Sequence, residues 1–218
     1  MQLNFLFMLK SAFTATVFLF LLFTTSAFSQ AGKDTILLLN GNVVITNVID
    51  TTDGITNFKD PKNEKKNFTI ENDRIFSITD SAGEHIMYVY DTILGNEFTI
   101  DEMRYFIRGE QDAEKGFKAN GALITGMIIG AASGVTGSIL CPIPPFGFAI
   151  LAGLPKVKIK ANTVTNKEDL KQDTYLMGYE RVARKKRKLK SLIGGGIGLG
   201  IGLGTFFILQ STGKELIQ

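Results

Sequence analysis

Residues 121–140 of the chain read GALITGMIIGAASGVTGSIL, and residues 191–210 read SLIGGGIGLGIGLGTFFILQ. Neither stretch contains a charged residue. Each also has about the 20 residues that a helix needs to cross a hydrocarbon core of about 30 Å. We therefore expect two glycine-rich transmembrane helices. The first covers about 121–141 within an apolar segment, 119–155, and the second covers 191–210, before a tail at 211–218.

Glycine recurs at four-residue spacing in both stretches. This spacing produces a flat stripe on a helix, along which another backbone can approach closely, and in lipid such stripes favour helix–helix packing. We expect the partner to be the other stretch or a second copy of the chain, which would make a homo-oligomer. The predicted packing residues form three series: Gly126, Gly130 and Gly134; Gly194, Gly198 and Gly202; and Gly196, Gly200 and Gly204.

A strongly basic segment separates the two stretches. Residues 156–190 hold twelve Lys or Arg against four Asp or Glu, whereas residues 30–120 hold ten against sixteen. Loops rich in Lys and Arg stay on the cytoplasmic side of membranes. We therefore expect 156–190 to be a cytoplasmic loop and helix, across the membrane from the acidic part. Its predicted topology and lipid-headgroup contacts are Arg184, Lys185, Lys186, Arg187, Lys188 and Lys190.

The N-terminus has the pattern of a secretory signal peptide over residues 1–29. Lys10 is the only charge in the first 32 residues, and an apolar core follows over 12–23. Ala27 and Ser29 then supply the small residues that precede a cleavage site. An uncleaved signal anchor is the alternative. We expect a bacterial cell-envelope protein in the inner membrane with its N-terminal domain outside the cytoplasm; the outer membrane and the periplasm are the alternatives.

Residues 30–98 are expected to form a small extracytoplasmic β-domain. Turn signals at Asn40-Gly41, at Asp53-Gly54 and over 81–84 separate short runs rich in β-branched residues. Such spacing indicates an antiparallel meander or a small barrel, similar in outline to SH3-like or Sm-like barrels. With the helices that follow, the fold class is α+β. The predicted strands cover 34–39, 43–49, 55–58, 68–70, 75–79 and 86–90.

Two further helices are predicted beside the apolar stretches. Thr99 and Glu102 have the spacing of a capping box, which predicts an amphipathic helix within 99–118. Similar residues at 165–168 predict a second helix over about 166–190. The two helices are weak internal repeats, each with a glycine, Gly109 or Gly178, three residues after an aromatic. These glycines are either tolerated in the helices or mark a close contact between them.

The combination of these features resembles exported glycine-rich membrane proteins of the Bacteroidota. Three groups of residues carry the resemblance: Asp34-Thr35-Ile36 with Asn40-Gly41, the segment 109–113, and Gly178-Tyr179 before the basic run. The resemblance covers most of the chain after the signal peptide. It implies no activity, cofactor or partner.

No catalytic or metal-binding motif is recognisable in the sequence. His85 and Cys141 are the only residues of their types, which argues against a metal cluster or a disulfide. The run 194–198 lacks the preceding strand and the following Lys-Ser/Thr that a phosphate-binding loop needs. We expect no enzyme activity and no cofactor.

The expected function is that of a non-catalytic, membrane-anchored envelope protein. Its β-domain would bind or scaffold an envelope protein that the sequence does not identify, while its glycine stripes associate helices in membrane lipid. Nucleic-acid binding by the basic run and a pore formed by the glycine-rich helices are lesser alternatives. The main alternative is a soluble or peripheral envelope enzyme with a carboxylate-based site at Asp91, Glu97, Asp101 and Glu102.

Overall fold

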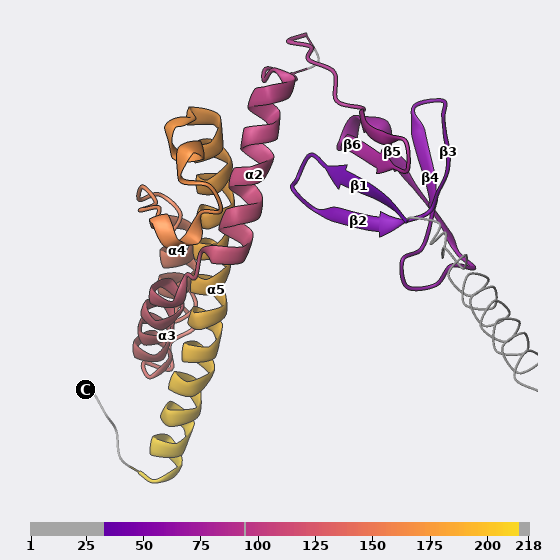
Figure 1. Ribbon diagram of the computed structural model, residues 1–218. Coiled ribbons are helices and arrows are strands. Elements are labelled where there is room, and N and C mark those ends of the chain that lie inside the picture. Colours follow the sequence, from indigo (N-terminus) through magenta and orange to yellow (C-terminus); the bar gives the residue numbers. More distant parts are fainter. Residues whose placement is uncertain (1–32, 94, 214–218) are drawn as a thin grey trace, which may run out of the picture.

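The computed structural model describes residues 33–93 and 95–213 (Figure 1). The predicted signal peptide and residues 214–218 of the tail lie outside the described residues. Within them the fold is α+β, as predicted: two small antiparallel sheets are followed by helices.

Seven short strands form the β-domain. One sheet has the strand order β2-β1-β6-β7 and the other has the order β3-β4-β5. The strands are β1 (Asp34–Leu38), β2 (Val43–Thr46), β3 (Val48–Thr52), β4 (Ile55–Lys59), β5 (Asn67–Glu71), β6 (Ile75–Asp80) and β7 (Gly83–Ile86).

The predicted second strand, 43–49, is in fact two strands in different sheets. β2 pairs with β1 and β3 pairs with β4, so the chain changes sheet at Asn47. The corner is held by Lys59, whose N–H donates to the Asn47 carbonyl (3.1 Å) and whose carbonyl accepts from the buried Thr46 hydroxyl. Strands that switch sheets in this way allow two sheets to close over one core. That core consists of Ile36, Phe58, Ile75 and Ile78.

The last predicted strand, 86–90, is also corrected. β7 covers Gly83–Ile86 because Asp80 Oδ1 accepts the N–H groups of Ala82 and Gly83 (2.7 and 3.1 Å), and this tight turn starts the return strand early. Beyond β7 the N–H groups of Met87 and Tyr88 both donate to the Phe76 carbonyl of β6, and the regular strand ends. The Tyr88 side chain is buried there, and its hydroxyl donates to the Phe98 carbonyl at 2.7 Å.

Four α-helices follow the β-domain. Among the described residues they are α2 (Ile100–Gly116), α3 (Asn120–Gly134), α4 (Ile143–Leu151) and α5 (Asp173–Ser211). Short 3-10 helices lie inside the β-domain at η1 (Asn72–Arg74) and before α5 at η2 (Ala161–Thr163) and η3 (Lys167–Lys171). The capping box predicted for α2 is present, since Thr99 and Glu102 cap each other's backbone N–H groups.

Three helix boundaries differ from the prediction. The cap at Asn166 starts η3 rather than a long helix, and α5 begins at Asp173. α5 then continues without a break to Ser211, and no proline interrupts the basic and apolar stretches that were assigned to separate segments. The first predicted span, 121–141, is also shorter: α3 has 15 residues and ends at Gly134.

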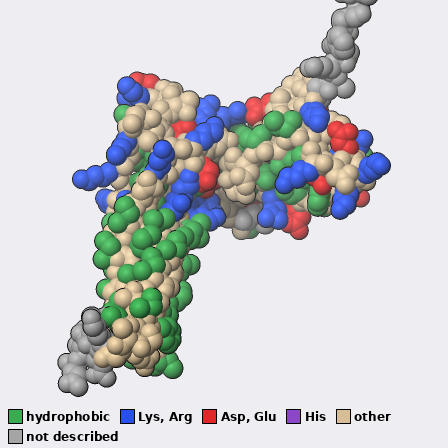
Figure 2. All heavy atoms as spheres, turned by 90° about the horizontal axis from the view of Figure 1, so that it is seen from below, with side chains coloured by type: hydrophobic (Ala, Val, Ile, Leu, Met, Phe, Trp, Pro, Cys, Tyr) green, Lys and Arg blue, Asp and Glu red, His purple; other side chains and the backbone are tan. Residues whose placement is uncertain are grey.

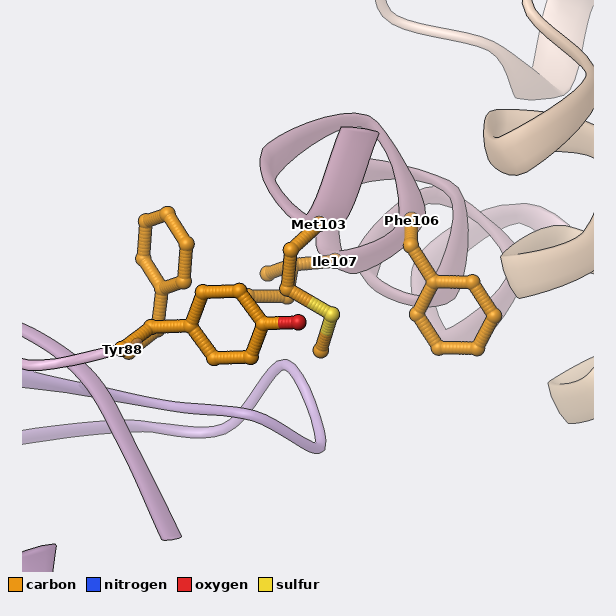
Figure 3. Close-up of a cluster of buried hydrophobic side chains, with 5 residues drawn as sticks. Tyr88, Met103, Phe106 and Ile107 are labelled. Carbon is orange, nitrogen blue, oxygen red and sulfur yellow. The ribbon is translucent and has the colours of Figure 1, made fainter. Parts of the chain in front are cut away.

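A buried apolar cluster joins the β-domain to α2 (Figure 3). Phe76 and Tyr88 from the β-domain meet Met103, Phe106 and Ile107 from α2. The side-chain amide of Gln111, one turn further along α2, donates to the carbonyl of Gly41 in the β1–β2 turn at 3.0 Å. The β-domain is thus fixed to α2 by both apolar and polar contacts.

α2 in turn packs against the first half of α5, and the two helices run parallel. A Cβ atom added at Gly109 would lie 2.2 Å from the Tyr175 carbonyl oxygen, and one added at Gly178 would lie 2.1 Å from that of Phe106. Of the two readings of these glycines, close contact between helices therefore holds. Further along, Lys186 of α5 donates to carbonyls at the end of α2, which fixes the parallel direction.

Asp112 is the buried polar centre of the contact between α2 and α5. Its carboxylate accepts hydrogen bonds from the Tyr175 hydroxyl (2.7 Å), the Thr165 N–H (2.9 Å) and the Thr165 hydroxyl (2.5 Å). These bonds tie the loop before α5 to both helices.

Replacing Asp112 should therefore destabilise the helical part strongly. Asp112→Ala leaves the buried Tyr175 hydroxyl and the two partly buried donors of Thr165 without their acceptor, and we expect the free energy of unfolding to fall by about 2–4 kcal/mol. Tyr175→Phe removes only one donor and should cost about 1 kcal/mol. Chemical unfolding of the full chain in detergent micelles, followed by circular dichroism, measures both changes. A larger loss from Tyr175→Phe than from Asp112→Ala would contradict this role.

Candidate functional site

α3 and the second half of α5 pack backbone against backbone. Cβ atoms added at Gly126, Gly130 and Gly134 would lie 2.4, 2.2 and 2.7 Å from carbonyl oxygens of α5. In the other direction, Cβ atoms at Gly194, Gly198 and Gly202 would lie 2.0, 2.0 and 2.4 Å from carbonyl oxygens of α3. Real Cβ atoms do not approach so closely, so this contact requires glycine at all six positions.

The two helices contribute equivalent residues to this contact, so exchanging α3 and α5 leaves its pattern unchanged. A shift of 68 residues maps the glycine series of α3 onto that of α5, and the carbonyls that they meet obey the same shift: Gly126 faces Ser191, while Gly194 faces Leu123. In α2 a shift of 69 residues relates Gly109 to Gly178 in the same way. In these glycine contacts α2 and α3 together correspond to α5, so the helical part contains an internal structural repeat.

The third predicted series does not take part in this contact. Gly196, Gly200 and Gly204 have no atom within 4 Å of an added Cβ, so they lie on an open side of α5. Of nine glycines predicted from spacing, the structure thus brings six together. The packing partner in this structure is the other apolar stretch of the same chain.

α3 and α5 run in the same direction, which differs from the antiparallel pair of spans expected from the sequence. Leu123, Met127 and Ala131 of α3 meet Gly194, Gly198 and Gly202 of α5 in order. The chain returns between them through α4: Gly137 lies against Phe206, Pro145 against Gly195, and Gly153 against Lys188. Residues 120–154 therefore form a hairpin that packs along α5, and with 191–211 they make up what we call the stem.

The surface of the stem is apolar and uncharged. Figure 2 shows hydrophobic side chains over the projecting stem, and Lys and Arg where it joins the body. α5 is long and apolar enough to span a membrane, and only 22% of its most apolar 18-residue window is buried within the fold. The exposed apolar side chains include Ile124, Ile128, Ile139, Ile150, Leu154, Ile197, Ile201, Phe207 and Ile208.

The hairpin tip satisfies its own polar groups. Between α3 and α4 the hydroxyls of Thr136 and Ser138 accept backbone N–H groups at 3.4 and 3.3 Å, and the N–H groups of Gly137 and Cys141 donate to carbonyls three residues back. Irregular backbone survives at membrane depth only when its polar groups are paired in this way. Cys141 is buried in this turn and has no histidine or charged residue beside it in sequence.

Three of the six predicted basic residues clamp the chain instead of facing outward. Arg184 and Arg187 donate to the carbonyls of Leu154 (3.3 Å) and Pro155 (2.7 Å), just after α4. Lys186 donates to the carbonyls of Ala113 (3.2 Å) and Glu114 in the last turn of α2. Cations at a helix C-terminus stabilise the unpaired carbonyls there. These three residues therefore hold the ends of α2 and α4 against α5.

The other three predicted basic residues, Lys185, Lys188 and Lys190, are exposed, and lysines from two other segments join them. One group lies at the end of α2 and the other follows α4, whose end Arg184 and Arg187 hold against α5. These lysines are far from residues 184–190 along the chain, so the basic run alone did not predict them. We call the eight exposed lysines the collar: Lys115, Lys118, Lys156, Lys158, Lys160, Lys185, Lys188 and Lys190.

Glu110 is a buried carboxylate on the side of α2 that faces the collar. Its side chain is 5% exposed, one oxygen lies 3.4 Å from Arg181 Nη1, and the other has no hydrogen-bond partner among the described residues. Burial raises the pKa of Glu110, while Arg181 and Lys185 oppose that rise. Its charged form therefore weakens the folded state.

Two of the four carboxylates of the alternative enzyme site have structural roles. Glu102 accepts from Thr99 in the capping box, and Asp91 accepts the Ile93 N–H at 2.8 Å in a turn. Glu97 and Asp101 are exposed. His85 pairs with Asp80 at 3.4 Å on the surface. Within residues 33–93 and 95–213, no group of three His, Cys, Asp or Glu is arranged to hold a metal ion.

No protein-family model, curated protein or solved structure matches this chain. The resemblance to exported Bacteroidota proteins therefore stays a prediction.

The glycine contact can be tested with a matched pair of substitutions. Gly130→Ala places a Cβ 2.2 Å from the Gly195 carbonyl, and we expect the free energy of unfolding to fall by about 1–3 kcal/mol as the helices are pushed apart. Gly200→Ala adds the same methyl group where nothing lies within 4 Å, and should be neutral or gain up to about 1 kcal/mol. Unfolding of each variant in detergent micelles gives both values. Equal effects would refute the contact.

Glu110 should make stability depend on pH. Since its pKa is raised in the folded state, the folded state holds this proton to higher pH than the unfolded chain, and stability falls as pH rises. Glu110→Gln has no charge to bury at this position, so its stability should not show this fall as pH rises. At each pH the melting temperature of the parent is subtracted from that of the variant. We expect this difference to be larger at pH 7.5 than at pH 4.5. Glu71→Gln, at an exposed carboxylate on β5, is the control. A difference that stays constant with pH would contradict the assignment.

Proposed function

We propose that this chain is a non-catalytic, membrane-anchored envelope protein that holds its β-domain at a membrane surface, where it binds or scaffolds another envelope protein. The observation that carries the proposal is the uncharged, glycine-packed stem. Its apolar side chains stay exposed after folding, although burying them would stabilise a soluble fold.

The lengths of the helices support one span with a hairpin beside it. From Ser191 to Ser211, α5 is about 31 Å long, close to the thickness of a hydrocarbon core of about 30 Å. The hairpin tip at Gly137 reaches the level of Phe206, about 24 Å beyond Lys190. We therefore propose that α5 crosses the membrane, while residues 120–154 enter it and return to the same side.

This arrangement puts the collar and the β-domain on one side. The β-domain packs on α2, α2 packs on the first half of α5, and α3 begins where the collar ends. The two-span topology, with residues 156–190 across the membrane from the β-domain, does not fit helices that run parallel. We keep the proposal that the N-terminal domain is extracytoplasmic, because the signal-peptide pattern supports it. The collar is then placed on the same side, against the general preference of Lys and Arg for the cytoplasmic side.

The enzyme alternative has no observation in its favour, since the carboxylates named for it cap a helix, hold a turn or face solvent. Self-association is a proposal that now rests on the open series Gly196, Gly200 and Gly204 alone.

Cysteine labelling tests the topology. The chain has one cysteine, so Cys141→Ala gives a cysteine-free parent. Into it we would place Asn63→Cys in the β4–β5 loop, Lys158→Cys in the collar, or Thr212→Cys after α5. In intact spheroplasts, an impermeant maleimide should label the first two positions together. It should label Thr212→Cys only after the membrane is opened.

Two results would contradict the proposal. Labelling of Asn63→Cys and Lys158→Cys from opposite sides would restore the antiparallel pair of spans. Release of the full chain from membranes by alkaline carbonate would remove the anchor altogether. Fractionation of the same cells assigns the protein to the inner or the outer membrane.

A further inference from the structure

We propose that the collar is a binding surface for anionic phospholipid headgroups at the level where the stem enters the bilayer. This inference rests on the proposed anchoring function and names the lipid chemistry that the anchor selects. It begins from the convergence of three chain segments, 115–118, 156–160 and 185–190, on one level of the fold.

The level of the collar is set by contacts with α5. Lys186 reaches the last turn of α2, and the Arg187 guanidinium lies 5.7 Å from the centre of the Phe117 ring, next to Lys118. Arg187 also donates to the Pro155 carbonyl, which places Lys156 at the same height. The glycine contact of the stem begins directly beyond Lys190, where Gly126 meets Ser191 and Gly194 meets Leu123.

Other basic residues of α5 make the structural contacts at this level, which leaves the collar lysines free to bind. Arg184, Lys186 and Arg187 satisfy the helix ends and loop carbonyls, and two of the acidic groups at this level, Glu180 and Glu114, are paired with Arg184 and Lys186. The exposed lysines thus form a net positive surface next to the uncharged apolar surface of the stem, and Figure 2 shows Lys and Arg gathered where the stem joins the body. Lysines next to a membrane segment attract acidic lipids, and this order of charge above hydrocarbon matches a phosphate layer above acyl chains.

A nucleic acid fits this surface less well. Its phosphates could meet the lysines, but the duplex or strand would also lie against the exposed apolar side chains of the stem, such as Leu192 and Leu154. The described residues of the collar also present no row of exposed aromatic side chains on which bases could stack, as single-strand binders do.

A tryptophan reporter tests the proposal with the full chain. The protein has no tryptophan, so Leu189→Trp, at an exposed position between two collar lysines, gives a single fluorophore. The protein is reconstituted in vesicles that mix phosphatidylcholine and phosphatidylglycerol, with either lipid brominated in turn. Quenching by each lipid then reports its local concentration. We expect phosphatidylglycerol to be enriched about fivefold beside the reporter, and 0.5 M salt to reduce the enrichment.

Matched triple variants locate the effect. Lys118→Gln, Lys156→Gln and Lys190→Gln together remove one collar lysine from each segment, and should bring the enrichment close to one. Lys62→Gln, Lys65→Gln and Lys66→Gln together remove the same charge from the β4–β5 loop and should leave it unchanged.

Each outcome has a distinct meaning. No enrichment in the parent, or enrichment that survives the collar triple variant, would overturn the headgroup site while leaving the anchor intact. No quenching by either lipid would overturn the anchor itself. A labelled oligonucleotide is added to the same vesicles as a competitor; if the collar triple variant abolished its binding without changing the lipid enrichment, the surface would belong to nucleic acid instead.

Discussion

The structure depends on the close approach of the α5 backbone to the backbones of α2 and α3. Carbonyl oxygens of one helix lie where the Cβ atoms of the other would be, which is possible only because both carry glycine at the contact. In lipid, where apolar side chains gain nothing by leaving their surroundings, such close backbone packing is a main source of helix association. We call this backbone contact of α5 with α2 and α3 the seam. It positions the β-domain, the collar and the hairpin.

The α+β order, the turns at glycine and the capping box of α2 follow from local chemistry, which is why the sequence predicts them. The splitting of 43–49 into two strands does not, because it depends on which sheet each half joins. The direction of α3 relative to α5 was predicted wrongly for a similar reason. Charge bias describes loops between spans, whereas here residues 120–154 fold back along α5 and carry the chain to its starting level.

In the candidate site, too, the local sequence predicts some features, while others depend on contacts that form only in the folded chain. Four-residue spacing identifies glycine stripes but cannot say which side of α5 meets a partner, so it selected Gly196, Gly200 and Gly204 together with the six that make the contact. The sequence predicts one shared role for all six basic residues in 184–190. Their division into clamps and exposed lysines depends on carbonyls at 113–114 and 154–156, which approach them only in the folded chain.

The internal structural repeat has a consequence for how the proposed anchor assembles. Two separate helices that pair through glycine do so by mass action, and their pairing weakens when the protein is dilute in the membrane. Here both partners belong to one polypeptide, joined by residues 135–172, so each helix meets its mate at a high effective concentration fixed by the linker. The chain thus resembles a dimer fused into a single molecule, and its seam should be complete at any expression level.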